Sequence, residues 1–115
     1  MYKNYLVFEN ATLEQVIKII LTNSKRTVMV ISKKKKIIGT ISEGDILRSI
    51  LKKKNMSAPA SKIMNKSFKY LIDKKDTKKA KAIFIKYNVN ILPIINKNFK
   101  LLSVVTLSDL FNINE

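Results

Sequence analysis

A hydroxyl residue followed three positions later by an aspartate occurs twice in this chain, as Ser42-x-x-Asp45 and as Thr106-x-x-Asp109. Each pair stands where a strand-like apolar segment gives way to a helix-like one, so we expect it at a strand-to-helix turn. There the hydroxyl can cap the helix and the carboxylate can complement the helix dipole. The same turn can present amide groups to a phosphate, while the carboxylate accepts hydrogen bonds from a ribose diol. The spacing alone leaves a structural cap and a nucleotide site as alternatives.

The residue types that the chain lacks exclude several kinds of chemistry. It has no histidine and no cysteine among its 115 residues. A zinc site and a nucleophile activated by histidine are therefore excluded, and no disulfide framework can form. We expect no enzymatic activity and no required metal or cofactor.

The formal net charge of +15 comes from 23 Lys and Arg residues against 8 Asp and Glu residues, and it favours anionic partners. Lysine supplies almost all of it, because Arg26 and Arg48 are the only arginines. Arginine is the residue suited to bidentate recognition of phosphate and guanine. A site for single-stranded nucleic acid would also need aromatic residues for base stacking, and none alternate with the clusters Lys33–Lys36 and Lys52–Lys54. We therefore expect most lysines to be solvated, and nucleic-acid binding is the least favoured alternative.

The composition, 46% apolar, is that of a globular chain long enough for one domain or two small repeats. No apolar run approaches the roughly 18 residues of a membrane helix, and the N-terminus lacks the pattern of a secretion signal. We expect a soluble, cytoplasmic protein with no membrane partner.

The chain contains an internal repeat. When the sequence is shifted by 64 positions, Val28–Ile31 falls on Leu92–Ile95 and Ile38–Leu47 falls on Leu102–Phe111 without a gap. We expect two copies of one β-α-β-β-α unit: a first repeat at 1–52, a connector at 53–68 and a second repeat at 69–115. Because a unit of about 50 residues hardly buries its own core, the copies should pack about a pseudo-twofold axis.

Apolar spacing and helix caps predict the elements of each repeat. Thr12 and Gln15 have the spacing of a capping box before one helix, and a second helix is expected over 44–51. In the second repeat, helices are expected from a cap near Asp76 through Tyr87 and over 108–113. The strands are expected at 6–8, 27–31 and 36–42, with counterparts 64 residues later. Pro93 cannot donate to a ladder, so its strand should lie at a sheet edge or leave that amide position unpaired.

From about Leu6 to Phe111, the chain resembles a tandem pair of cystathionine-β-synthase (CBS) domains, also called a Bateman module. The segments that carry the resemblance are Gly39–Ile46, Ser103–Leu110, the apolar-Pro-apolar strand Ile91–Ile95 and the anchor Ser61–Met64. The resemblance implies an α+β (α/β) fold in which two β-α-β-β-α repeats pack about a pseudo-twofold axis.

The resemblance also implies a regulatory ligand, an adenosine nucleotide such as AMP, ADP or ATP, in the cleft between the repeats. By the family's motif, Thr106 and Ser42 face phosphate and Asp109 and Asp45 hold the ribose, with Ser108 beside them. Arg26 corresponds to a basic phosphate ligand of some family members. Glu43 adds a negative charge beside the first site, so the second site is the better candidate.

A narrower resemblance concerns the regulated partner. The segments 42–51 and 61–66 are similar to those of CBS pairs that precede sugar-phosphate nucleotidyltransferase domains, which implies such a catalytic partner. The family and the apolar stripes of the closing helices also predict a homodimer. The alternative function is a structural dimerisation module that binds no ligand.

Overall fold

The computed structural model of this chain describes residues 2–111. Within them, the predicted order of strand, helix, strand, strand and helix is confirmed in both repeats, and the fold is of the mixed α+β class. The first repeat contains β1 (Leu6–Phe8), α1 (Leu13–Asn23), β2 (Thr27–Ile31), β3 (Ile37–Ser42) and α2 (Glu43–Leu51). The second contains β4 (Leu71–Ile72), α3 (Thr77–Tyr87), β5 (Ile91–Ile95), β6 (Leu101–Thr106) and α4 (Leu107–Phe111). Two short 3₁₀ helices, η1 (Lys3–Tyr5) and η2 (Ala60–Lys62), were not predicted.

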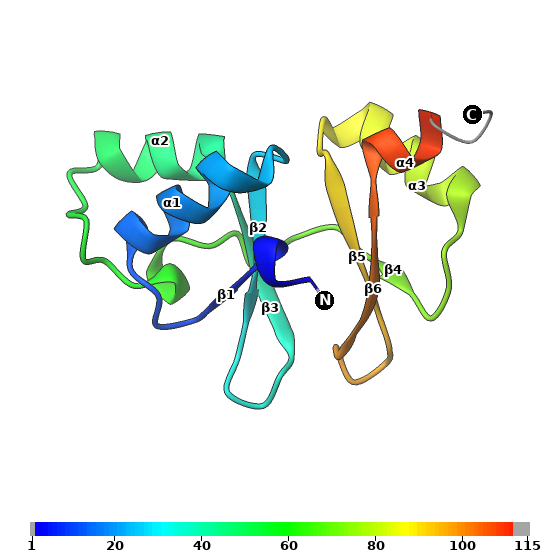
Figure 1. Cartoon of the computed structure of the whole chain (residues 1–115), viewed down its shortest axis with the longest axis horizontal. Helices are drawn as coiled ribbons and strands as arrows, with labels where there is room; N and C mark the ends of the chain where they lie inside the picture. Colours follow the sequence, from blue (N-terminus) through cyan, green and yellow to red (C-terminus); the bar gives the residue numbers. More distant parts are fainter. Residues whose placement is uncertain (1, 112–115) are drawn as a thin grey trace. The chain divides into compact units, whose positions relative to one another are not determined.

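The described chain divides into two compact units between Phe68 and Lys69. Each unit contains a three-stranded sheet, in the order β1-β2-β3 or β4-β5-β6. In both sheets the first strand is parallel to the central strand and the last is antiparallel to it. The helices of each repeat lie on one side of its own sheet (Figure 1).

The antiparallel strand pairs of the two sheets agree residue by residue at the predicted offset of 64. Thr27 pairs with Ser42 in the first sheet, and Ile91 pairs with Thr106 in the second. The register shifts between Val30 and Ile31, and again between Ile94 and Ile95. A bulge determines which side chains of a strand face the core. Equivalent positions of the two repeats therefore face the core in both sheets.

The helices begin where the sequence predicts them within one residue. Thr12 and Gln15 form both hydrogen bonds of a capping box at α1, and the Asp76 side chain accepts a hydrogen bond from the Lys79 amide at α3. The helix expected from Gly44 starts instead at Glu43, because Ser42 is its N-cap. Of the helix expected over 108–113, the described part runs from Leu107 to Phe111, and Ile113 lies outside the described residues.

Each unit has its own hydrophobic core. The first core joins strands β1 to β3 to both helices and includes Ala60 and Ile63 of the predicted connector. The second core is smaller and centres on Leu71, Phe84 and Leu92. Among the helices in residues 2–111, none has the length and apolar character needed to cross a bilayer.

Pro93 lies in the central strand of its sheet, so the edge alternative is wrong, whereas the other expected alternative, an unpaired position, agrees with the lack of a Pro93 partner in β4. The first sheet pairs Leu6 with Met29, whereas the corresponding pair of Tyr70 and Pro93 is missing and β4 begins at Leu71. Because proline has no N–H to donate, the ladder starts one residue later. The fold therefore accommodates the proline by shortening the neighbouring parallel strand.

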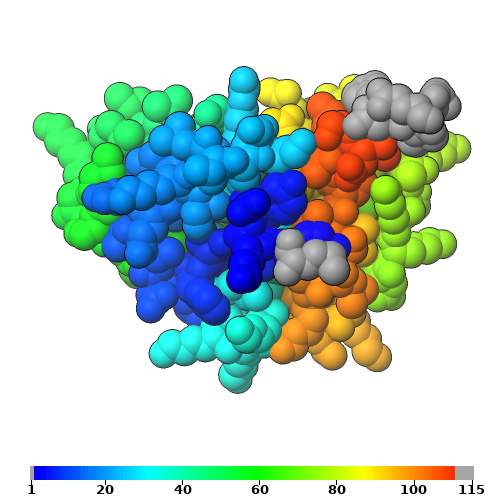
Figure 2. Space-filling view, viewed as in Figure 1, coloured from blue at the N-terminus to red at the C-terminus, as the bar shows by residue number. Residues whose placement is uncertain are grey.

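The four lysines of the loop Lys33–Lys36 are exposed, and this loop (cyan in Figure 2) projects from the first unit. The Lys35 ammonium lies 5.2 Å from the ring centroid of Phe8, and Lys33 donates its backbone N–H to Glu9. These lysines are solvated, as the sequence predicts for most of the positive charge.

Gly39 is a point of close packing between β3 and the connector. A Cβ atom at this position would lie 2.6 Å from the Met64 sulfur and 3.0 Å from the Met64 Cβ. The approach is fixed by two backbone hydrogen bonds between Thr40 and Asn65, of 2.8 and 3.1 Å. The first repeat thus needs a glycine at this position, because Met64 packs against it. The counterpart in the second repeat is a serine, Ser103.

We expect Gly39→Ala to lower the free energy of unfolding by about 1–3 kcal/mol, because the added methyl group forces Met64 and the connector away from β3. Gly44→Ala is the matched control, since it adds the same methyl group inside α2, where the nearest atoms are the guanidinium nitrogens at the far end of the Arg48 side chain, at 3.3 and 3.4 Å. Alanine there should be neutral or stabilise by up to about 1 kcal/mol. Denaturant unfolding measures both, and an equal effect of the two substitutions would contradict the packing role of Gly39.

Candidate functional site

Ser42 and Asp45 are joined by reciprocal hydrogen bonds at the start of α2. The Asp45 amide donates to the Ser42 hydroxyl oxygen at 3.2 Å, and the Asp45 carboxylate oxygen Oδ2 accepts from the Ser42 amide at 2.9 Å. The Ser42 hydroxyl also donates to Oδ2, at 3.0 Å. The predicted cap is confirmed, and it aligns a hydroxyl and a carboxylate at one strand-to-helix turn.

The second carboxylate oxygen of Asp45 is occupied as well. The Arg48 guanidinium donates to Asp45 Oδ1 at 2.7 Å, and the Asp45 side chain is only 15% exposed. The hydroxyl proton of Ser42 and both oxygens of Asp45 therefore have partners within the first unit. These three hydrogen bonds fix the orientation of the carboxylate, and Oδ1, which accepts one of them, can accept a second donor.

Arg26 adjoins the same turn, because its carbonyl accepts a hydrogen bond of 3.1 Å from the Glu43 amide. Its guanidinium lies 3.8 Å from the Glu43 carboxylate, and both side chains are more than half exposed. An exposed pair at this distance holds neither side chain firmly. Arg26 is thus placed at the turn, with its charge facing that of Glu43.

Thr106 and Asp109 repeat this arrangement in the second unit. The Asp109 amide donates to the Thr106 hydroxyl oxygen at 3.2 Å, and Asp109 Oδ2 accepts from the Thr106 amide at 2.9 Å. The Leu107 amide donates to the Asn90 carbonyl at 2.9 Å, as Glu43 does to Arg26. The backbone frame of the turn is the same in both repeats.

The side chains around the second turn differ from those around the first. The Thr106 hydroxyl lies 3.1 Å from the Ser108 hydroxyl, and apolar Leu107 stands at the position of Glu43. Thr106 is buried whereas Ser108 and Asp109 are exposed. The second turn therefore presents two hydroxyl groups and one carboxylate without an added glutamate.

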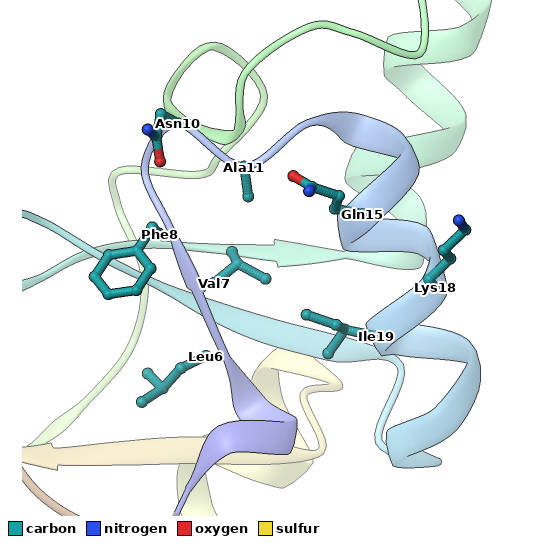
Figure 3. A pocket seen from close by; sticks show the side chains of 8 residues that line it. All are labelled: Leu6, Val7, Phe8, Asn10, Ala11, Gln15, Lys18 and Ile19. Carbon is teal, nitrogen blue, oxygen red and sulfur yellow. The ribbon is translucent and has the colours of Figure 1, made fainter.

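A separate groove of about 680 Å³ runs along β1 and α1 in the first unit (Figure 3). Its walls are mostly apolar, and Gln15 and Lys18 of α1 supply polar groups. The groove lies beside the carboxyl end of β1. Ser42 lies toward the opposite end of the sheet, because it pairs with Thr27 at the amino end of β2, and β1 and β2 are parallel. None of the predicted site residues lines this groove.

The structure thus brings together Ser42, Asp45 and the backbone of Arg26 in one unit, and Thr106, Ser108 and Asp109 in the other. The sequence reasoning did not assign a role to Arg48, which contacts Asp45. The signal for it was available, since an arginine three residues after an aspartate lies on the same face of a helix.

Comparison with known proteins identifies the family. The family model of the CBS domain matches residues 1–52 and again residues 60–114. An uncharacterized 17.7 kDa protein from Acidianus ambivalens is 28% identical over 108 residues. The match covers 94% of this chain and 65% of that protein, so the chain spans just under two thirds of its relative's length.

Solved structures share the fold of this chain. PAE2072, a CBS domain protein from Pyrobaculum aerophilum complexed with AMP, gives a TM-score of 0.75 at 24% identity, covering 90% of this chain and 80% of that one. CBSX2, solved in complex with AMP, gives a TM-score of 0.80 at 15% identity, with coverages of 98% and 89%. The duplicated β-α-β-β-α unit, the repeated hydroxyl–aspartate turn and the family match over both repeats lead to one conclusion: the chain belongs to the CBS domain family, as a tandem pair.

Proposed function

We propose that this CBS pair is a regulatory module that binds an adenosine nucleotide, of the AMP, ADP or ATP kind, at its hydroxyl–aspartate turns. The observation that carries the proposal is the turn of the second unit, where Thr106, Ser108 and Asp109 gather around one set of reciprocal hydrogen bonds. The complexes of PAE2072 and CBSX2 with AMP support the class of ligand.

Each proposed ligand group matches the chemistry of one side chain. The Asp109 carboxylate accepts hydrogen bonds from the ribose diol, because it is exposed and its Oδ2 is already oriented by the Thr106 amide. The hydroxyl groups of Thr106 and Ser108, 3.1 Å apart, serve as donors toward phosphate. In the first unit Ser42 and Asp45 take the same proposed roles, and Arg26 supplies positive charge for the phosphate.

The proposed output is regulation of a partner domain. A bound nucleotide changes the activity of the partner domain only if it binds one arrangement of the repeats more tightly than the other. As the partner we propose a sugar-phosphate nucleotidyltransferase domain, because segments 42–51 and 61–66 are similar to those of CBS pairs that precede such enzymes. This chain contributes regulation rather than turnover.

A thermal-shift series with AMP, ADP, ATP, S-adenosylmethionine and GMP tests the proposal on the wild type and on Asp109→Asn. A ligand that binds only the folded state stabilises it by about 2.7 kcal/mol at 100 times its Kd, so one adenosine ligand should raise Tm by several degrees. Asparagine keeps an oxygen for the Thr106 amide but removes the carboxylate charge. The variant should therefore fold and lose at least about tenfold in affinity.

Asp76→Asn is the matched control, because it makes the same change at the cap of α3, where the side chain holds the Lys79 amide and belongs to neither turn. This variant should keep the full ligand-induced shift. No shift of the wild type with any of the five compounds at millimolar concentration would contradict nucleotide binding and favour the ligand-free dimerisation alternative.

The second proposed property is homodimerisation through α2. Ile46 and Ser49 face the core of the first unit, whereas Leu47, Ile50 and Leu51 are 62%, 47% and 81% exposed. Three exposed apolar side chains at spacings of three and four residues make one continuous stripe on a helix. A second copy of the chain presents the same stripe, so a twofold contact buries both.

We expect Leu47→Glu combined with Leu51→Glu to raise the dimer dissociation constant at least about tenfold, since it places like charges on both sides of the proposed contact. Sedimentation velocity over a concentration series measures the effect. Met56→Glu changes another exposed apolar residue, 49% exposed, outside α2 and should leave the dimer intact. A monomeric wild type, or equal weakening by both variants, would contradict an interface on this helix.

A further inference from the structure

We propose that the groove along β1 and α1 binds an extended acidic segment of a partner protein, which adds to the first sheet as a strand beside β1. The segment lies parallel to β1, with one apolar side chain in the groove and its carboxylates near the surrounding lysines. The groove is lined by the first unit alone, and by none of the residues proposed to bind a nucleotide. The inference therefore goes beyond the proposed function and does not depend on it.

The strand β1 lies at one edge of the first sheet. The Glu9 amide donates to the Ile31 carbonyl at 3.1 Å, so this residue directs its backbone toward β2. Backbone groups alternate in direction along a strand, so Val7 also faces β2, whereas Leu6 and Phe8 direct their N–H and C=O groups away from it. These two residues form the outer edge of the sheet.

Two of the four backbone groups on this edge are already bonded. The Leu6 amide donates to the Lys3 carbonyl, and the Phe8 carbonyl accepts from the Ala11 amide at 2.9 Å. Within the part of the chain that the structure describes, the Leu6 carbonyl and the Phe8 N–H have no partner. One residue placed opposite Val7 can donate to the first and accept from the second, which is the pattern of a parallel strand pair.

The groove offers a place for one side chain of the added strand. Paired residues of neighbouring strands point to the same face of a sheet, so the residue opposite Val7 directs its side chain toward α1. Val7 is 4% exposed and points toward α1, while Ile19 points from α1 toward β1 (Figure 3). Ala11 adds to this apolar wall. An apolar side chain fits there, because a charged one would lose part of its hydration.

The charges around the groove favour an acidic occupant. Lys18 lines the groove, and the Lys35 ammonium lies 5.2 Å from the ring centroid of Phe8 at the end of β1. The whole loop Lys33–Lys36 is exposed. Charges of opposite sign across an interface speed association and select the complementary partner.

The same edge could also accept β1 of a second copy, but the charges disfavour it. A second copy brings its own Lys18 and Lys35 into the contact, so like charges would face each other. The nearby glutamates offset this only in part. Glu14 lies 3.2 Å from Lys18, and Glu9 accepts a hydrogen bond from the backbone amide of Lys33 and not from its ammonium. The surface therefore remains positive, and an acidic segment is the favoured occupant.

Fluorescence anisotropy with the labelled peptide fluorescein-Glu-Glu-Thr-Ile-Thr-Glu-Glu-amide tests the proposal. The peptide has one apolar side chain, two threonines that favour an extended chain, and acidic ends. We expect saturable binding that weakens as the salt concentration rises. A peptide with lysine in place of glutamate should bind at least about tenfold more weakly. A peptide N-methylated at isoleucine should also lose at least about tenfold, because it lacks the N–H that the Leu6 carbonyl accepts.

Ile19→Glu places a negative charge in the groove and should weaken binding of the acidic peptide at least about tenfold. Leu21→Glu is the matched control, since it makes the same change on the same helix at a residue that is 75% exposed and does not line the groove. It should keep the affinity of the wild type. If circular dichroism shows that Ile19→Glu is unfolded, Lys18→Glu replaces it, because the Lys18 side chain is 72% exposed.

Hydrogen exchange measured by NMR locates the added strand. Saturating peptide should slow exchange of the Phe8 amide at least about tenfold, because this N–H gains an acceptor on the peptide. The Glu9 amide is the internal reference, since it already donates to Ile31 and should change less.

Equal binding of the methylated and unmethylated peptides, or unchanged exchange at Phe8, overturns strand addition. Equal loss in Ile19→Glu and Leu21→Glu overturns the groove as the site, and a lack of saturable binding overturns the proposal as a whole. Slower exchange at Phe8 with rising protein concentration and no peptide assigns the edge to a second copy instead. Asp109→Asn should bind the peptide like the wild type, so failure of this proposal and failure of nucleotide binding are distinguishable.

Discussion

The reciprocal hydrogen bonds between a hydroxyl residue and the aspartate three positions later are the contact on which both repeats depend. Each set ends a sheet strand, starts a helix and satisfies amide groups that would otherwise lack a partner at the helix start. A further backbone bond joins the first helical residue to the segment before the central strand. The residues proposed to hold a nucleotide are therefore also structural residues, and a change of function at this turn is constrained by the need to keep the cap.

That constraint explains how two equivalent turns can differ in chemistry. The backbone and the capping pair leave little freedom, whereas the neighbouring positions on the helix are free to vary. In the first repeat these positions carry Glu43 and Arg48, so both oxygens of the aspartate are bonded and a carboxylate stands nearby. In the second repeat Leu107 stands at the position of Glu43 and Ser108 at the position of Gly44. Divergence between duplicated sites is thus concentrated in residues that touch the cap without forming it.

The sequence predicted the parts of the fold that depend on local pattern. The offset of 64, the caps at Thr12 and Asp76 and the order of elements all follow from residues close together along the chain. The packing of Met64 against Gly39 could not be predicted in this way, because the two residues are brought together by the connector. For Pro93 the sequence left an edge strand and an unpaired position as alternatives, and only the structure decides between them: the strand is central, and the pairing with β4 begins one residue after the proline. For the site, the sequence located both turns, and the spacing of Asp45 and Arg48 already places them on one face of α2, but the hydrogen bond between them is established only by the structure.

The large positive charge of the chain does not by itself select a ligand. Lysines such as those of the loop 33–36 are exposed, and their field is screened over about 8 Å at physiological ionic strength. They raise the local concentration of any anion, whether a nucleotide or another polyanion. Selection then depends on the turns, where an aspartate favours neutral hydroxyl donors such as a ribose diol and disfavours a bare phosphate. Under the proposed function, a basic chain with an acidic residue at each proposed site attracts anions in general and selects those that also carry a diol.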